Sequence, residues 1–217
     1  MRKIATLIVA ALSLATAVAQ ENISHSDIKD IIKNEKEYYR DIVLHNYLCD
    51  DPGIRLNDYA IVYYGQVYLP EYRGSNDSNI EQLKNYAATG DAIKRYETAK
   101  KILEYNPASL TALFNAWQAS EQLIKPESET NSYLIKYLGI LNMITTMGDG
   151  KSSKSAYRII FPDDEEHILN LYTDKVISKS FDADTKCRII TVQPGERFNA
   201  SRMYIDISSY LTHTTKK

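Results

Sequence analysis

Four consecutive acidic residues, Asp163–Glu166, follow Phe161-Pro162 and are the densest group of side chains that could do chemistry. Neighbouring carboxylates can bind a hard cation such as Ca²⁺ or act as an acid–base pair. The same run is typical of a solvated turn, or of the first turn of a helix, where the helix dipole favours negative charge. Because no second acidic cluster faces it, we expect a structural role and predict no metal site here.

A glycine-containing segment, Gly148-Asp149-Gly150-Lys151-Ser152, has some features of a phosphate-binding loop. A Walker A loop needs another glycine five residues before Gly150, where this chain has Thr145, and it needs a strand before it and a helix after it. We therefore expect a tight helix-to-strand turn, with positive φ at Gly148 and Gly150 and with Asp149 bonded to nearby amides. No cofactor is predicted.

Histidine and cysteine are sparse. The histidines His25, His45, His167 and His213 are scattered, and we recognise no Cys/His pairing or serine-hydrolase elbow among them. We accordingly predict no catalytic residues. Cys49 and Cys187 allow one disulfide in an oxidising compartment, or two separately buried thiols. We favour the separate thiols.

Tyrosine is the compositional anomaly, with 17 of 217 residues. Tyr63, Tyr64, Tyr68 and Tyr72 fall close together, one turn after Tyr59. Tyrosine offers rigid contact area with a polar tip, which suits interfaces and sugar stacking. We expect one face of this segment to be core and the other to be a contact surface. Tyr64, Tyr68 and Tyr72 are the predicted binding residues.

The start of the chain predicts its destination. Arg2 and Lys3 precede an apolar run, Ile4–Val18, which ends in Ala17-Val18-Ala19. This pattern is typical of a secretory signal peptide over residues 1–19, although a buried N-terminal helix is the alternative. We expect an exported protein, periplasmic or extracellular. No later apolar stretch is long enough to span a membrane. The net charge of −2, without a basic block, argues against nucleic acid as a partner.

Apolar residues at three- and four-residue spacing predict a helical region over residues 20–147. Asp91 and Ser109 are the expected N-caps of two of its helices, and Gly148 is the expected stop of the last one. The predicted helices are Asp27–Val43, Asn57–Leu69, Ala92–Tyr105, Leu110–Ile124 and Tyr133–Met147, with a weaker one at Ile80–Ala88.

After Met147 the period changes to two, which predicts an antiparallel β region over residues 148–217, packed on the last helices. The expected strands lie in Ser155–Phe161, Thr185–Val192 and Met203–Ser208, and Ile168–Tyr172 fits either a strand or a helix. The predicted fold is α+β and mainly α, with helical hairpins followed by a small antiparallel sheet.

Part of the helical region fits the tetratricopeptide pattern, whose first helix carries W-x₂-L-G-x₂-Y. Ile61, Tyr64, Gly65 and Tyr68 occupy those four places. Gly90-Asp91 and Asn106-Pro107 mark turns, but Arg95 stands where a small residue is wanted. Tetratricopeptide-like helical hairpins are therefore expected, rather than regular repeats with a continuous groove.

The chain also resembles a family of uncharacterised exported proteins of Gram-negative gut anaerobes. The resemblance rests on YYGQVYLPEYRG at 63–74, GDAIKRYETAKKILEYNPASLTAL at 90–113, GDGKSSKSAYRII at 148–160 and MYIDIS at 203–208. It implies a degenerate tetratricopeptide-like helical region, a short C-terminal β part and export. It implies no activity, substrate or site residue.

The leading functional prediction is an exported, non-catalytic protein-interaction module of the cell envelope, with a protein or peptide docking on Tyr64, Tyr68 and Tyr72. The alternative is a carbohydrate-binding or carbohydrate-processing envelope protein, in which tyrosine would stack on sugars. A tyrosine beside a convergent pair of carboxylates in a pocket would favour the glycan. A hydrolase whose groups meet only in the fold is a third possibility.

Overall fold

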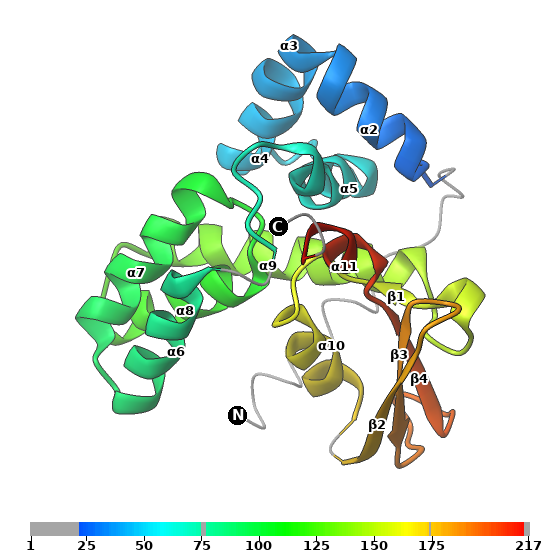
Figure 1. Cartoon of the computed structure of the whole chain (residues 1–217). Helices are drawn as coiled ribbons and strands as arrows, with labels where there is room; N and C mark the ends of the chain where they lie inside the picture. The colour runs from blue at the N-terminus through cyan, green and yellow to red at the C-terminus, as the bar shows by residue number, and fades with distance from the viewer. Residues whose placement is uncertain (1–21, 75–76, 174, 215–217) are drawn as a thin grey trace. The chain divides into compact units, whose positions relative to one another are not determined.

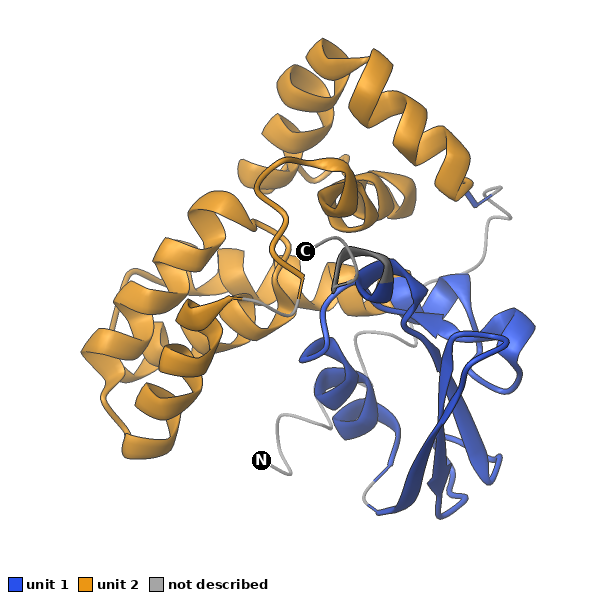
Figure 2. Ribbon diagram, viewed as in Figure 1, with its two compact units in different colours: residues 1–22, 144–217 blue, residues 23–143 orange. Residues whose placement is uncertain are grey.

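The computed structural model describes residues 22–74, 77–173 and 175–214. The fold is mainly α, with one small mixed sheet in the last third of the chain (Figure 1). The chain divides into two compact units (Figure 2). We call residues 23–143 the helical unit, and residues 144 onward, with which Asn22 is grouped, the C-terminal unit. The predicted signal peptide, residues 1–19, lies outside the described residues.

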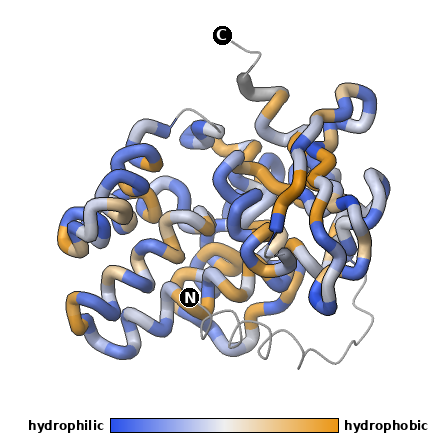
Figure 3. The backbone as a smooth tube through the Cα atoms, turned by 90° about the horizontal axis from the view of Figure 1, so that it is seen from below, coloured by the Kyte–Doolittle hydropathy of each residue, from blue (hydrophilic) through white to orange (hydrophobic). Residues whose placement is uncertain are grey.

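Amphipathic helices build the helical unit. Hydrophobic and hydrophilic residues alternate along them in short runs, as expected for helices with one buried side (Figure 3). The elements are α2 (His25–Asn34), α3 (Lys36–Tyr38), the π-helix η1 (Tyr39–Leu44), α4 (His45–Leu48), α5 (Leu56–Gly65), the 3-10 helix η2 (Gln66–Tyr68), α6 (Ser78–Thr89), α7 (Ala92–Tyr105), α8 (Leu110–Gln122) and α9 (Glu127–Met147), which continues past residue 143.

The prediction of one continuous helix from Asp27 to Val43 is wrong, because the helix breaks at Glu35 (φ −116°) and passes into η1. Its buried residues explain the change: Tyr39, Val43 and Tyr47 recur every four residues. A spacing of four drifts around an α-helix of 3.6 residues per turn. The wider π turn reduces this drift and keeps the three side chains on the buried side.

Helices α6, α7 and α8 pack in sequence around an alanine-rich core. Leu83, Ala99, Ile102, Ala112 and Ala116 are its buried members, and the small alanines let the helices approach closely. The two predicted caps are confirmed: the carboxylate of Asp91 accepts from the amide of Lys94 at 3.1 Å, and the Ser109 hydroxyl accepts from the amide of Ala112 at 3.2 Å. The tetratricopeptide-like assignment itself stays a prediction.

Arg95, which departs from the repeat pattern, bridges α7 and α8. Its guanidinium is largely buried and donates to Asn115 Oδ1 at 2.6 Å and to the side-chain oxygen of Gln118. Burial lowers the pKa of Arg95. A polar link thus replaces the small residue that a repeat would carry at this position.

The C-terminal unit contains the remaining elements and the end of α9. They are the 3-10 helix η3 (Ser153–Ser155), β1 (Tyr157–Arg158), α10 (Asp164–Tyr172), β2 (Val176–Asp182), β3 (Cys187–Val192), β4 (Arg202–Asp206) and α11 (Ser208–Thr214). The strands form one sheet in the order β1-β4-β3-β2. The antiparallel pairing predicted for this region is confirmed for β3 and β4, and β2, which was not predicted, pairs antiparallel with β3. The strand β1 runs parallel to β4, so the sheet is mixed.

The core of the C-terminal unit lies between the sheet and α10. Ile190, Met203 and Ile205 point inward from β3 and β4, and Ile168 does so from α10. Ile168–Tyr172, which fitted either a strand or a helix, is helical. This arrangement supports the loops and turns described below.

Both thiols are free, but the expectation that both are buried is wrong: Cys187 is buried and Cys49 is exposed. Among the described helices, none combines the length and apolar character needed to cross a bilayer.

Candidate functional site

A polar surface depression of about 280 Å³ lies within the C-terminal unit. We call it the Tyr172 depression. It brings together the end of α9, the turn after it, β1, α10 and the loop between β3 and β4. The lining residues are Thr145, Asp149, Lys151, Tyr157, Tyr172, Glu196, Arg197, Phe198 and Asn199.

Two stacked tyrosines form its aromatic part. The rings of Tyr157 and Tyr172 are nearly parallel, at 3°, with their centroids 5.3 Å apart. Tyr157 is buried, and burial raises its pKa, with a further contribution from the neighbouring Tyr172. Tyr172 is half-buried and also contacts the ring of Phe198, at 6.0 Å between centroids. Tyr172 is therefore the aromatic residue of the pair that reaches solvent.

The turn after α9 holds Tyr157 and Asp149 in place. Gly150 has φ +67°, and a Cβ there would overlap the ring of Tyr157. Gly148 does not have the positive φ that we predicted; a side chain is excluded there because a Cβ would lie 2.7 Å from the carbonyl oxygen of Ala156. Each glycine is thus required by the close approach of another segment.

Asp149 caps this turn, as the sequence predicted. Its Oδ1 accepts from the amide of Lys151 at 3.0 Å and from the hydroxyl of Ser155 at 2.5 Å. These hydrogen bonds, that of Ser155 first, hold the pKa of Asp149 below its ordinary value. The carboxylate is consequently ionised at neutral pH and serves as an acceptor.

The loop between β3 and β4 supplies the opposite wall. The amide of Gly195 donates to the carbonyl of Phe198 at 2.9 Å, which closes the loop, and the ring of Phe198 is buried. Arg197 donates from Nη1 to the carbonyl of Leu171 at 3.1 Å and so ties the loop to the end of α10. Glu196 is exposed beside it.

The depression is balanced in charge and rich in hydrogen-bonding groups. Asp149 and Glu196 oppose Lys151 and Arg197, so two carboxylates and two cations line one hollow. Carboxylates only accept hydrogen bonds, whereas ammonium and guanidinium groups only donate them. Such a lining suits a neutral ligand with many hydroxyl groups better than a phosphate or a bare cation.

The three predicted binding tyrosines lie elsewhere, in the helical unit. Tyr64 is only 2 % exposed and contacts the rings of His25 and Tyr63, so its assignment to an open contact face is wrong. The reason is close packing at the neighbouring Gly65, where a Cβ would lie 2.8 Å from Ile32 of α2. Tyr68 and Tyr72 are half-buried, and their role in binding stays a prediction.

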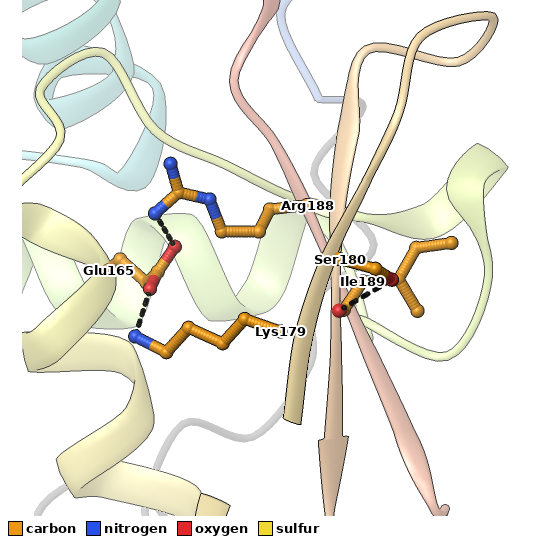
Figure 4. A network of polar contacts seen from close by, with 5 residues as sticks. All are labelled: Glu165, Lys179, Ser180, Arg188 and Ile189. Carbon is orange, nitrogen blue, oxygen red and sulfur yellow. Dashed lines mark hydrogen bonds and ion pairs between the residues drawn. The ribbon is translucent and has the colours of Figure 1, made fainter. Parts of the chain in front are cut away.

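The acidic run Asp163–Glu166 forms the first turn of α10 and is partly buried, not a solvated turn. Glu165 is 4 % exposed and accepts from Lys179 Nζ of β2 at 2.6 Å and from Arg188 Nη1 of β3 at 2.8 Å (Figure 4). The carboxylate thus joins α10 to the β2–β3 hairpin. Within the described part of the chain, no three His, Cys, Asp or Glu side chains converge as a metal site.

Several residues of the Tyr172 depression were not singled out from the sequence. Asp149 and Lys151 were noted as a turn, but Tyr172, Glu196 and Arg197 carry no local pattern that marks them. One Cys/His pair was also missed: His45 and Cys49 are four residues apart, and their Nε2 and Sγ lie 3.8 Å from each other. The helical spacing of four would have identified this pair.

Residues 25–216 match the family described as Domain of unknown function (DUF4919). The chain belongs to this family. The DUF4919 match spans both units, and the Tyr172 depression lies inside it. No curated protein and no solved structure matches the chain.

Proposed function

We propose that this DUF4919 protein is a non-catalytic binding protein that holds a glycan in the Tyr172 depression. The observation that carries the proposal is the half-buried Tyr172 ring beside two carboxylates and two cations. Sugar rings present apolar C–H faces, which pack on aromatic rings, and hydroxyl groups that both donate and accept hydrogen bonds. The lining offers partners for each of these features.

The size of the depression limits the ligand. Its volume of about 280 Å³ lies just below the range of about 300–1,000 Å³ that is common for small-molecule sites. We therefore expect one sugar residue, or the end of a longer glycan, to enter it. A neutral sugar is favoured because the two carboxylates and two cations leave no excess charge.

The state of Asp149 suits it to binding and does not suit it to act as the general acid of a glycoside hydrolase. A hydrolase needs one carboxyl group that stays protonated, with a raised pKa, to act as the general acid. The pKa of Asp149 is lowered instead, by its hydrogen bonds to Ser155 and Lys151. Asp149 is suited to accept hydrogen bonds from sugar hydroxyls and is a poor proton donor.

The test is a glycan array, followed by calorimetric titration of the best-bound glycan. We expect Tyr172→Ala and Glu196→Gln each to weaken binding by roughly tenfold or more, as loss of one aromatic or charged contact does. Tyr172→Phe keeps the ring and is expected to retain most of the affinity. Tyr68→Ala, a half-buried tyrosine of the helical unit, is the control. Equal affinity in all variants, or no glycan bound, would contradict the proposal.

A protein or peptide partner is the second candidate, supported by the partial exposure of Tyr68 and Tyr72 after α5. Exposed aromatic residues are enriched at protein interfaces. Alanine at both positions should then lower the affinity for a purified partner at least tenfold. Glycan binding should be unchanged, because Tyr68 and Tyr72 belong to the helical unit and the Tyr172 depression belongs to the C-terminal unit. An unchanged affinity for that partner would exclude this surface.

Export to the periplasm or the outside of the cell is part of both proposals. It is supported by the pattern of residues 1–19. Cell fractionation with N-terminal sequencing is the direct test, and the expected mature chain begins at Gln20. A chain that keeps Met1 and stays in the cytoplasm would refute it.

A further inference from the structure

His45 and Cys49 form an exposed pair in the helical unit, separate from the proposed glycan site. They lie one turn apart at the end of α4, where the amide of Cys49 donates to the carbonyl of His45 at 3.0 Å. The Nε2 of His45 and the Sγ of Cys49 are 3.8 Å apart, and both side chains reach solvent. The pair is therefore accessible to a ligand.

The separation of the two atoms fits a shared zinc ion. Zinc bonds to thiolate sulfur and imidazole nitrogen are about 2.3 and 2.1 Å long, so two such ligands at a tetrahedral angle stand about 3.6 Å apart. The observed 3.8 Å requires only a small adjustment of exposed side chains. The position also favours a cation, since Cys49 is the C-cap of α4 and the C-terminal end of a helix carries partial negative charge.

The pair is half of a zinc ligand set. Stable protein zinc sites usually have four ligands, commonly two cysteines and two histidines. No third His, Cys, Asp or Glu joins the pair among the described residues. A second copy related by a twofold axis supplies one more histidine and one more cysteine, which completes the set of four.

The surroundings of the pair also suit a second copy. Ile42, three residues before His45, is 49 % exposed, and Leu48, three residues after it, is 52 % exposed. Tyr38, one turn before Ile42, is 38 % exposed. Large apolar side chains next to an incomplete metal site are what a partner helix would cover.

We propose that a Zn²⁺ ion joins two copies of this protein, held by His45 and Cys49 of each. Both thiols lose their protons to solvent when the metal binds, so two thiolates balance the charge of the zinc ion and the neutral imidazoles add none. Ile42 and Leu48 of the two copies pack around the metal. This inference does not depend on the glycan proposal.

The experiment is titration of the tag-free, reduced protein with Co²⁺ and Zn²⁺, with absorption spectra and mass measured by light scattering. Co²⁺ is expected to produce a thiolate-to-cobalt charge-transfer band and tetrahedral d–d bands, and either metal should convert monomer to dimer at one ion per two chains. Cys49→Ser and His45→Gln should each remove the tetrahedral spectrum and the dimer. Cys187→Ser, which changes the other thiol, is the matched control.

Ile42→Glu keeps both ligands and tests the packing, and it is expected to weaken the metal-dependent dimer at least tenfold. The proposal is overturned if no thiolate band appears, if the band survives in Cys49→Ser, or if the metal binds while the protein stays monomeric. A dimer that forms without metal and disappears on reduction would also overturn it, since that product is a Cys49 disulfide.

Discussion

Ile124 occupies a backbone position that normally belongs to glycine. The amide of Ile124 donates to the carbonyl of Glu121 at 3.2 Å, and that of Lys125 donates to Ser120 at 2.9 Å, which is the Schellman pattern at the end of α8. Ile124 has φ +53° and is 91 % exposed. A β-branched residue in this left-handed region costs about 1–2 kcal/mol.

We expect Ile124→Gly to raise the free energy of unfolding by about 1 kcal/mol, because relief of backbone strain exceeds the extra chain entropy of glycine. Chemical denaturation is the measurement. Ile135→Gly is the control, since Ile135 is also exposed but lies inside α9, where glycine should lower stability by about 1 kcal/mol. A destabilised Ile124→Gly protein would show that the isoleucine side chain has a packing role.

His167 of α10 makes stability depend on pH. His167 is half-buried, and loss of solvent around its ring lowers its pKa to about 4, from 6.5 for an ordinary histidine. The unfolded chain therefore takes up a proton below about pH 6.5 that the folded chain does not take up until about pH 4. The contribution of neutral His167 to the free energy of unfolding is fully present above pH 6.5. It decreases by at most about 1.4 kcal/mol per pH unit as the pH falls from 6.5 to 4.

Unfolding free energies at about pH 7 and about pH 5 test this dependence. We expect His167→Gln to lose less stability over that interval than the wild-type protein, whatever its stability at neutral pH. Equal losses in the two proteins would mean that His167 is protonated in the folded state as readily as in the unfolded state.

At the scale of elements, Glu165 links α10 to the β2–β3 hairpin by ion pairs. Its buried carboxylate accepts from both Lys179 and Arg188, which are partly exposed. We expect Glu165→Gln to lower the free energy of unfolding by about 1–2 kcal/mol, because two charged hydrogen bonds are weakened while the shape is kept. Glu166→Gln, an exposed neighbour in the same helical turn, should change it by less than about 0.5 kcal/mol. Equal effects in thermal or urea denaturation would contradict this role.

Local signals predicted some elements well and others poorly. The bounds of α7, Ala92–Tyr105, were predicted from its apolar stripe and the cap at Asp91. The strand β2 was missed, because nearly all of its residues are exposed and its sequence lacks the alternation that a buried face imposes. The short β1 is defined by its parallel pairing with β4, which is a tertiary contact that no local pattern contains.

At the scale of the whole molecule, tyrosine joins elements rather than forming one open face. In the helical unit, the hydroxyl of Tyr47 donates to the carbonyl of Pro107 at 2.8 Å and that of Tyr105 donates to Asp77 at 2.5 Å, while Tyr96 bonds to Glu129. Each phenol fills core space and meets its hydrogen-bonding need. The composition shows that tyrosine is abundant, but it does not show which tyrosine side chains point into the core and which point to solvent.

The candidate site was beyond local prediction for a similar reason. The Tyr172 depression gathers side chains from five separate segments, and only the turn at Gly148–Lys151 had a recognisable pattern. Glu196 and Arg197 lie in a loop whose course depends on contacts such as that of Arg197 with Leu171. Their convergence follows from the sheet order and the packing of α10, which the sequence does not state locally.

The continuity of α9 predicts how the two units unfold. This helix runs unbroken from Glu127 to Met147 and so belongs to both units, with Ile140 and Ile144 each 0 % exposed. Trp117 of α8, the single tryptophan, reports on the helical unit alone. If one end of α9 melts, the other end loses hydrogen bonds and packing as well. We therefore expect the two units to unfold in one cooperative transition.

Glu165→Gln, a change in the C-terminal unit, should then shift the Trp117 fluorescence midpoint by the same amount as the far-ultraviolet circular dichroism midpoint. Trp117 fluorescence reports the unfolding of the helical unit, which carries no substitution. A shift of its midpoint therefore means that the change in the C-terminal unit affects the helical unit. A fluorescence midpoint that stays at the wild-type value while the dichroism midpoint falls would mean that the units unfold independently. In that case α9 frays at the boundary near residue 143, and a ligand bound in the Tyr172 depression would stabilise only the C-terminal unit.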